Sequence, residues 1–177
     1  MQIQELYNLA LKHQQEHDCS AHPYENGERL VSTLREHNSK SILEIGTGCG
    51  YTAAIMAMVS KEIKIDTIEK DSVHAEVANK FIMSCGMESR VNIINKMAED
   101  YLPSLLNQYD LIFFDGFQIH YEFLPHYERL LKKGGILFLG NNHLLSKTSD
   151  QFFFELRNSE KWRIQEQFDD TTIAIRN

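Results

Sequence analysis

The sequence predicts an α/β protein with a doubly wound, mostly parallel β-sheet. Short, nearly continuous apolar runs alternate with helical stretches along most of the chain, which is typical of a parallel sheet covered by helices on both faces. A glycine-rich turn follows the first of these runs, and "WRIQEQFDDTTIAIRN" at the end reads as two strands joined at Asp169-Asp170. We therefore expect an antiparallel hairpin at one edge of the sheet.

The order of the elements follows from the switch between the two periodicities. Apolar runs of strand length predict five parallel strands at 41–45, 63–68, 91–95, 110–114 and 135–139. Helical patterns are present at 2–17, 26–37, 51–60, 72–85, 98–107 and 119–132, and "SDQFFFELRN" reads as a further, capped helix. In "LLKKGG" we expect a helix to end, because lysines favour the negative end of the helix dipole and glycines favour the turn that follows.

One domain accounts for the whole sequence. A chain of 177 residues with 42% hydrophobic residues and three prolines is long enough for one buried core and short for two. It contains no internal repeat, low-complexity tract or linker. We therefore predict a single domain over 1–177, with two helices in 1–38 and the sheet with its covering helices in 39–177.

The composition narrows the classes of partner and the compartment. A formal net charge of -7 argues against binding of free nucleic acid or of an anionic membrane, because both need clustered lysines and arginines. No apolar window approaches the length of a membrane span, and the first 18 residues carry too many charges for a secretion signal. Cys19, Cys49 and Cys85 lack the spacing of a zinc site or a disulfide framework. We therefore expect a small-molecule partner and a cytoplasmic location.

The stretch "ILEIGTGCGYTA" predicts a ligand site after the first strand. Gly46, Gly48 and Gly50 alternate in the turn into the next helix, where a missing Cβ lets the backbone lie against a ligand. Ligands of open α/β sheets bind at such a turn, beside the carboxyl ends of the strands. A tight turn without a ligand is the alternative, and the repeated alternation of glycine favours binding over it.

The glycine spacing admits two kinds of cofactor. Gly48, Gly50 and Ala53 satisfy the G-x-G-x-x-G/A pattern of dinucleotide-binding turns, and Glu69 follows at the separation expected of an acidic residue that binds a ribose. A nicotinamide cofactor is therefore one alternative. The carboxylate of Glu44, just before the loop, would repel a pyrophosphate but tolerate a cationic ligand. S-adenosylmethionine, which carries a sulfonium, an amino group and a ribose diol, suits both Glu44 and Glu69.

Five segments together carry a resemblance to a known family. They are "ILEIGTGCGYTA", "IDTIEKD", "VNIINKMAEDYLP", "YDLIFFDGFQIHY" and "LLKKGGILFLGNN". In this order, from about His22 to Asn142, they resemble the motifs of class I S-adenosylmethionine-dependent methyltransferases, and more narrowly those of the catechol and caffeoyl-CoA O-methyltransferases. The resemblance implies a Rossmann-like sheet of seven strands that ends in an antiparallel hairpin, with the helices of 1–38 forming part of the cover over the cofactor and substrate. It also implies O-methylation of a small-molecule hydroxyl, such as a phenol or catechol, and a homodimer.

The resemblance also implies which residues contact the cofactor. Gly46, Thr47 and Gly48 would lie against its methionine part, with Thr52 near the carboxylate. Glu69 would accept hydrogen bonds from the ribose hydroxyls. The adenine would be flanked by Lys70, Ala98 and Glu99, with Asp115 bordering the opposite, reacting end of the site. An ordinary helix start, with acidic residues at the positive end of the dipole, is the alternative reading of 98–100.

At the acceptor end the sequence departs from the family pattern in two places. The relatives hold a divalent cation with an aspartate that corresponds to Asp115 and with an Asp-Asn pair, which reads Asn141-Asn142 here. Mg²⁺ prefers carboxylate and other oxygen ligands, so the loss of one carboxylate should weaken its binding. A lysine that serves as base in the relatives is replaced by Gln118, which cannot accept a proton. We predict Asp115, His120 and His143 as catalytic residues, since both histidines are expected near the strand ends, and His22 is a third candidate for the base.

Three other functions remain open on the sequence. A methyltransferase acting on a nucleoside in RNA is one, although the acidic charge of the chain counts against it. A nicotinamide-dependent oxidoreductase is the second, although the chain lacks room for a separate substrate domain. The third is a binding protein that keeps the cofactor pocket without catalysis, which the changes at Gln118 and Asn141 would allow.

Overall fold

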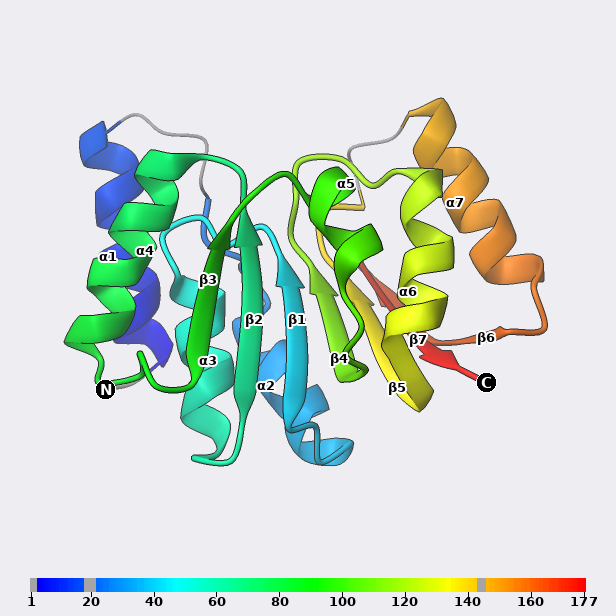
Figure 1. Ribbon diagram of the computed structural model, residues 1–177, viewed down its shortest axis with the longest axis horizontal. Coiled ribbons are helices and arrows are strands. Elements are labelled where there is room, and N and C mark those ends of the chain that lie inside the picture. The colour runs from blue at the N-terminus through cyan, green and yellow to red at the C-terminus, as the bar shows by residue number, and fades with distance from the viewer. Residues whose placement is uncertain (1–2, 18–21, 143–145) are drawn as a thin grey trace.

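Seven strands form one sheet, in the order β3-β2-β1-β4-β5-β7-β6, in the computed structural model, which describes residues 3–17, 22–142 and 146–177 (Figure 1). The strands are β1 (Ser41–Ile45), β2 (Lys64–Glu69), β3 (Val91–Asn95), β4 (Tyr109–Phe114), β5 (Leu131–Leu139), β6 (Trp162–Phe168) and β7 (Thr171–Arg176). The first five pair in parallel, whereas β7 runs antiparallel to both β5 and β6. The predicted mostly parallel sheet with an antiparallel hairpin at its edge is therefore confirmed.

Helices cover both faces of the sheet, as the nearly continuous apolar strands predict. One core joins Ile42, Phe113 and Phe138 of the sheet to α1 (Ile3–His17), α2 (Gly27–Glu36), α3 (Tyr51–Val59) and α4 (Ser72–Ser84). A second core joins Leu43 and Phe114 to α5 (Ala98–Tyr101), α6 (Leu124–Leu130) and α7 (Lys147–Asn158). Because successive strand residues point to opposite faces, each strand contributes to both cores. Among the residues that the structure describes, no helix is long and apolar enough to cross a membrane.

Two predicted helices are shorter than their patterns suggest. The helix expected at 98–107 is reduced to α5 and a 3₁₀ turn at Leu102–Ser104, and the one expected at 119–132 to a 3₁₀ turn at Tyr121–Phe123 followed by α6. A helix does end within "LLKKGG", at Leu130, but the lysines and glycines that follow already belong to β5. Leu131 pairs with Tyr109 and begins β5, and the Lys132 ammonium binds the Asp110 carboxylate at 2.6 Å. Pairing with β4 thus begins β5 at Leu131, earlier than the predicted start at 135.

The parallel strands end at the same edge of the sheet, and this edge fixes where the site lies. Ladder hydrogen bonds continue one residue beyond the strands, from Gly46 N–H to the Ile68 carbonyl at 3.0 Å and from Asp115 N–H to the Ile45 carbonyl at 2.8 Å. A third runs from Gly140 N–H to the Phe114 carbonyl at 2.8 Å. The residues that follow β1, β4 and β5 therefore leave the sheet side by side.

A buried carboxyl group on β1 ties the first two strands to α3. Glu44 has no exposed surface, and its two oxygens accept hydrogen bonds from the hydroxyls of Thr52 on α3 and Thr67 on β2, the latter at 2.5 Å. The Thr67 hydroxyl also meets that of Thr47 in the glycine loop at 2.6 Å. Burial raises the pKa of Glu44 to about 7, and the nearby Glu69 adds to the rise, while the threonine hydrogen bonds oppose it.

The Phe152–Phe154 run of α7 is divided between the core and the surface. Phe152 is 0% exposed and packs edge-on against Tyr127 of α6, with ring centroids 6.2 Å apart. Phe154, two positions later and on the opposite side of the helix, is 63% exposed. Only the first of these two aromatic rings therefore stabilises the packing of α7 on the sheet.

We expect Glu44 to make stability depend on pH. Its pKa is about 7 when folded, against an ordinary value of 4.5, so folding favours the protonated form. This stabilisation is complete below the unfolded pKa and is lost as the pH rises through the folded pKa. Relative to Glu44→Gln, the wild-type free energy of unfolding in urea should fall by on the order of 3 kcal/mol from about pH 4.5 to about pH 8. Parallel profiles for the two proteins would contradict this, and exposed Glu88→Gln is the matched control.

We expect Phe152→Ala to lower the free energy of unfolding by about 3–5 kcal/mol, because it leaves a cavity in a fully buried site. Phe154→Ala, the matched control on the same helix, should change it by no more than about 0.5 kcal/mol. Denaturant titration of both variants measures the difference. Equal losses in the two variants would show that α7 does not pack as described.

Candidate functional site

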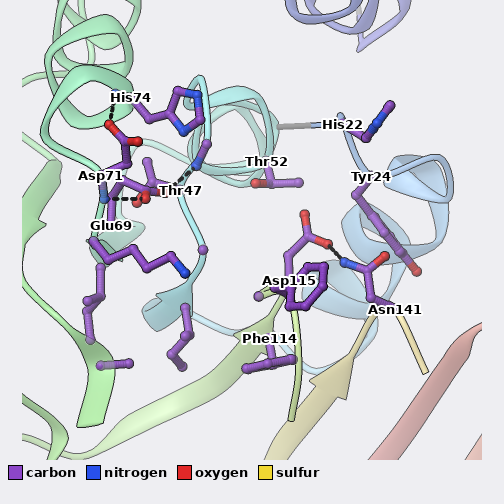
Figure 2. A pocket seen from close by; sticks show the side chains of 18 of the residues that line it. His22, Tyr24, Thr47, Thr52, Glu69, Asp71, His74, Phe114, Asp115 and Asn141 are labelled. Atoms are coloured by element: carbon purple, nitrogen blue, oxygen red, sulfur yellow. Dashed lines mark hydrogen bonds between the residues drawn. The ribbon is translucent and has the colours of Figure 1, made fainter. Parts of the chain in front are cut away.

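A pocket of about 830 Å³ opens where the carboxyl ends of β1, β2, β4 and β5 meet (Figure 2). Its lining includes the glycine loop after β1, the end of β2, the residues that follow β4, and Asn141 after β5. The segment before α2, from His22 to Glu25, forms a further wall. The volume lies within the range of small-molecule sites, and the place is the one at which open α/β sheets bind ligands.

The glycine loop is shaped by left-handed backbone conformations. Gly46 and Gly48 have φ values of +94° and +52°, which side-chain-bearing residues rarely adopt. A Cβ on Gly46 would lie 2.6 Å from the Asp115 carbonyl oxygen. The first glycine is therefore required by the close passage of the chain after β4, in addition to any ligand. Gly48, Thr47 and Thr52 border the pocket, with both threonine side chains almost wholly buried.

Glu69, the last residue of β2, holds the loop in place from the side. One carboxylate oxygen accepts the Gly48 N–H at 2.9 Å, and the other accepts the Asp71 N–H at 2.8 Å. Figure 2 shows these two hydrogen bonds beside the open pocket. Each carboxylate oxygen has two lone pairs, so both oxygens retain the capacity to accept one more hydrogen from a ligand.

The remaining residues predicted at the cofactor end divide into two groups. Lys70, Ala98 and Glu99 all line the pocket. Glu44 lies beneath the loop, outside the pocket lining, and reaches the site only through Thr52, Thr67 and Thr47. The structure therefore places Glu44 as a support of the loop, and its direct contact with a ligand stays a prediction.

Three charged or titratable residues at this end were not predicted from the sequence. Asp71, His74 and Lys96 line the pocket beside Glu69. Asp71 caps α4 by accepting the backbone N–H of Val73 at 2.8 Å. Aspartate is a common residue just before a helix, so the sequence did contain a signal for the position of Asp71. Nothing in the sequence placed Lys96 against this pocket.

At the other end of the pocket, the side chains after β4 and β5 form a polar pair. The Asn141 amide donates to Asp115 Oδ1 at 2.7 Å, and Figure 2 shows the second oxygen of Asp115 pointing away from Asn141. Burial raises the pKa of the Asp115 carboxyl well above its ordinary range, the charge of Glu44 and then that of Asp170 adding to the rise, while the hydrogen bond from Asn141 opposes it.

Two residues near this pair were missed by the sequence analysis. Tyr24 is buried against Phe113 and Phe138, and its hydroxyl meets the Thr171 hydroxyl at 2.7 Å. Burial is the main cause that raises the Tyr24 pKa above its ordinary value of 10.0. Asp170, in the turn between β6 and β7, also lines the pocket. Only the folding of the hairpin back to the end of β5 brings Asp170 here.

The predicted catalytic residues are only partly placed. Asp115, His120 and Gln118 line the same pocket, and the His120 ring packs edge-on against Phe123 at a centroid distance of 5.5 Å. His22 also lines the pocket, on the wall before α2. His143 lies outside the described residues, so its role stays a prediction.

The amides of Asn141 and Asn142 are both engaged in hydrogen bonds, and metal binding at Asp115, Asn141 and Asn142 stays a prediction. Asn141 presents an amide N–H to Asp115, and the Asn142 amide donates to Thr172 Oγ1 at 2.8 Å, away from the pocket lining. Across residues 3–17, 22–142 and 146–177, no group of three or more His, Cys, Asp or Glu side chains could hold a metal ion. One carboxylate with two engaged amides is a poor donor set for a hard cation.

Comparisons with known proteins agree with this geometry. Residues 1–159 match the family described as O-methyltransferase. Catechol O-methyltransferase B of Danio rerio is 30% identical over 150 residues, which are 78% of this chain and 55% of that protein. Caffeoyl-CoA O-methyltransferase of Populus kitakamiensis is 30% identical over 129 residues, covering 67% of this chain and 54% of that protein. This chain thus spans about half the length of the curated relatives it matches.

Solved structures share the fold over nearly the whole chain. The O-methyltransferase TomG from Streptomyces achromogenes, in complex with SAM, has a TM-score of 0.85 at 22% identity, covering 97% of this chain and 89% of that one. An O-methyltransferase from Klebsiella pneumoniae has a TM-score of 0.85 at 24% identity, covering 97% of this chain and 90% of that one. These likenesses show the shared fold, and the family match over residues 1–159 shows that the chain belongs to the O-methyltransferase family.

Proposed function

We propose that this chain binds S-adenosylmethionine and transfers its methyl group to a hydroxyl of a small molecule, such as a phenol or catechol. The observation that carries the proposal is one pocket with a glycine loop, Glu69 at one end and the Asp115–Asn141 pair at the other. The names of the catechol and caffeoyl-CoA relatives support the reaction. Solved relatives described as complexes with SAM or SAH support the cofactor.

The residues at the loop end fit the parts of this cofactor. The free lone pairs of Glu69 would accept the two ribose hydroxyls, while its existing bonds hold Gly48 and Asp71. Gly46, Thr47 and Gly48 would border the methionine part, with Thr52 near its carboxylate. Lys70, Ala98 and Glu99 would surround the adenine.

The residues at the other end would hold the acceptor. When bound, the cofactor supplies an electrophilic methyl group on a sulfonium. As the acceptor oxygen bonds to the methyl carbon, the carbon–sulfur bond breaks with its electron pair remaining on sulfur. We assign the hydroxyl proton to His120, which lines this end of the pocket and whose imidazole can accept a proton. Alignment of oxygen, carbon and sulfur would account for much of the acceleration.

The location and assembly expected from the sequence are also part of this proposal. A cytoplasmic location is supported by cysteines without a disulfide spacing, and a homodimer by the resemblance to the family. A small-molecule acceptor is preferred over nucleic acid because the chain carries a net charge of -7.

We expect Glu69→Ala to weaken S-adenosylhomocysteine binding roughly 10- to 100-fold, because the ribose loses a charged hydrogen-bond acceptor. Isothermal titration of wild type and variant measures this, with NAD⁺ expected to give no heat. Glu69→Gln keeps an acceptor for the Gly48 N–H and separates ribose recognition from loosening of the loop. Exposed Glu88→Ala is the surface control. Binding of NAD⁺ without the adenosyl compounds would favour the nicotinamide reading.

We expect His120→Gln to lower the rate of methyl transfer by about 100-fold or more, the usual contribution of a general base. S-adenosylhomocysteine affinity should stay within about threefold of wild type, since the substitution is made at the acceptor end. Single-turnover transfer to a phenolic acceptor, combined with titration, separates the two effects. A rate within about threefold of wild type would assign the proton to a different acceptor.

A further inference from the structure

The ends of β4 and β5 place Asp115 and Asn141 in direct contact. Phe114 pairs with Leu139 in the parallel ladder, and the Gly140 N–H then donates to the Phe114 carbonyl at 2.8 Å. The next side chains on the two strands therefore face each other, and the Asn141 amide donates to Asp115 Oδ1 at 2.7 Å. Asn141 has a φ of +57°, a left-handed conformation that asparagine and aspartate adopt more readily than most residues. This contact is thus built by the sheet register.

The bonded oxygen of Asp115 is enclosed on a second side. A Cβ placed on Gly140 would lie 3.4 Å from Asp115 Oδ1 and 3.2 Å from the Tyr24 ring. Oδ1 therefore lies against the Gly140 backbone as well as the Asn141 amide, and the ring of buried Tyr24 also packs against Gly140. Figure 2 shows the other oxygen turned away from Asn141, so one carboxylate oxygen is committed to the protein and one is directed elsewhere.

Asn142 is committed to the neighbouring hairpin. Its amide donates to Thr172 Oγ1 at 2.8 Å, and its backbone N–H donates to the Asp170 carbonyl at 2.8 Å. Thr172 also accepts the Gln167 amide at 3.1 Å. The Asn142 side chain is therefore part of the junction between β5 and β7 and lies outside the pocket lining.

These contacts leave a hydrogen-bonding pair where the family pattern expects a cation. The side chains that follow β4 and β5 offer one carboxylate, with an amide N–H directed at it. A cation between Asp115 and Asn141 would have to break this bond and rotate the amide, and Asp115 is the only carboxylate of the pair. The pair can hold a neutral hydroxyl without rearrangement, because the second N–H of the Asn141 amide can donate to the hydroxyl oxygen and leaves the hydroxyl hydrogen for His120.

We infer that the Asp115–Asn141 pair positions the acceptor hydroxyl by direct hydrogen bonding and takes the place of a divalent cation in this chain. The inference rests on the proposed function, because it concerns the acceptor end of that site. A cation orients an acceptor by binding two neighbouring oxygens, whereas this pair needs only one hydroxyl oxygen. The acceptor class therefore extends to molecules with a single hydroxyl, and a vicinal diol has no required role.

The test is titration of the purified protein with MgCl₂ and MnCl₂, with and without S-adenosylhomocysteine. We expect wild type to show no saturable binding up to about 1 mM, since it offers one carboxylate and two engaged amides. Asn141→Asp restores the second carboxylate and should bind at least one of the cations at least tenfold more tightly than wild type. Asn142→Asp is the matched control and should remain like wild type, because position 142 faces Thr172.

The outcomes separate this inference from the proposed function. Saturable wild-type binding of either cation below about 1 mM, lost in Asp115→Asn, would overturn the inference. This outcome also covers a cation held jointly by Asp115 and Asp170, since both line the pocket. The wild-type titration decides this even if Asn141→Asp fails to fold, which thermal unfolding would reveal. Failure of S-adenosylhomocysteine to bind would instead overturn the proposed function, independently of the cation result.

Discussion

The common edge at which the parallel strands end is the constraint on which the rest of the site depends. The backbone hydrogen bonds that continue past β1, β4 and β5 hold Gly46, Asp115 and Gly140 at the same level along the strand direction. Each of these residues begins a segment that lines or shapes the pocket. Because parallel strands pair in a fixed register over two buried faces, a slip of one residue would send apolar core side chains into the site. The position of the site therefore follows from the stability of the sheet.

A chain of buried polar groups couples that sheet to the glycine loop. Glu44 lies without exposure between α3 and β2, and its hydrogen bonds to Thr52 and Thr67 replace the water it loses. Thr67 passes the contact on to Thr47 in the loop, and Glu69 holds the same loop through Gly48. Two carboxyl groups at the ends of adjacent strands thus fix one short loop. Their proximity also contributes to the raised pKa of Glu44, so the charge state of this support and the order of the pocket are linked.

At the proposed acceptor end, the amide of Asn141 stands where the family pattern has a carboxylate, on the same backbone framework. The backbone still brings the residues after β4 and β5 together, as the family pattern implies. With Asn141 in place, the contact becomes a hydrogen bond to Asp115, and Asn142 packs into the hairpin. The same geometry that would serve a cation with two carboxylates can serve a hydroxyl directly with one. Membership of the family therefore does not fix how the acceptor is held, which depends on the individual residues after β4 and β5.

Much of the fold could be predicted from the sequence because its signals are local and periodic. Buried parallel strands appear as short apolar runs, helices as amphipathic stretches, and the loop as alternating glycines. The predicted bounds were wrong where tertiary contacts extend an element, as at 131–134, which were expected to end a helix and form a turn but belong to β5, where Leu131 pairs with Tyr109.

The sequence by itself determined the sheet, its hairpin and the residues around the glycine loop, since these depend on patterns within a few residues. Only the tertiary structure decided that Glu44 lies beneath the loop, that Tyr24 and Asp170 reach the pocket, and that Asn141 bonds to Asp115 while Asn142 turns to Thr172. The bonds of Asn141 to Asp115 and of Asn142 to Thr172 join residues 26 and 30 positions apart. Their partners are chosen by strand order and by the space left between packed elements, which no local pattern encodes.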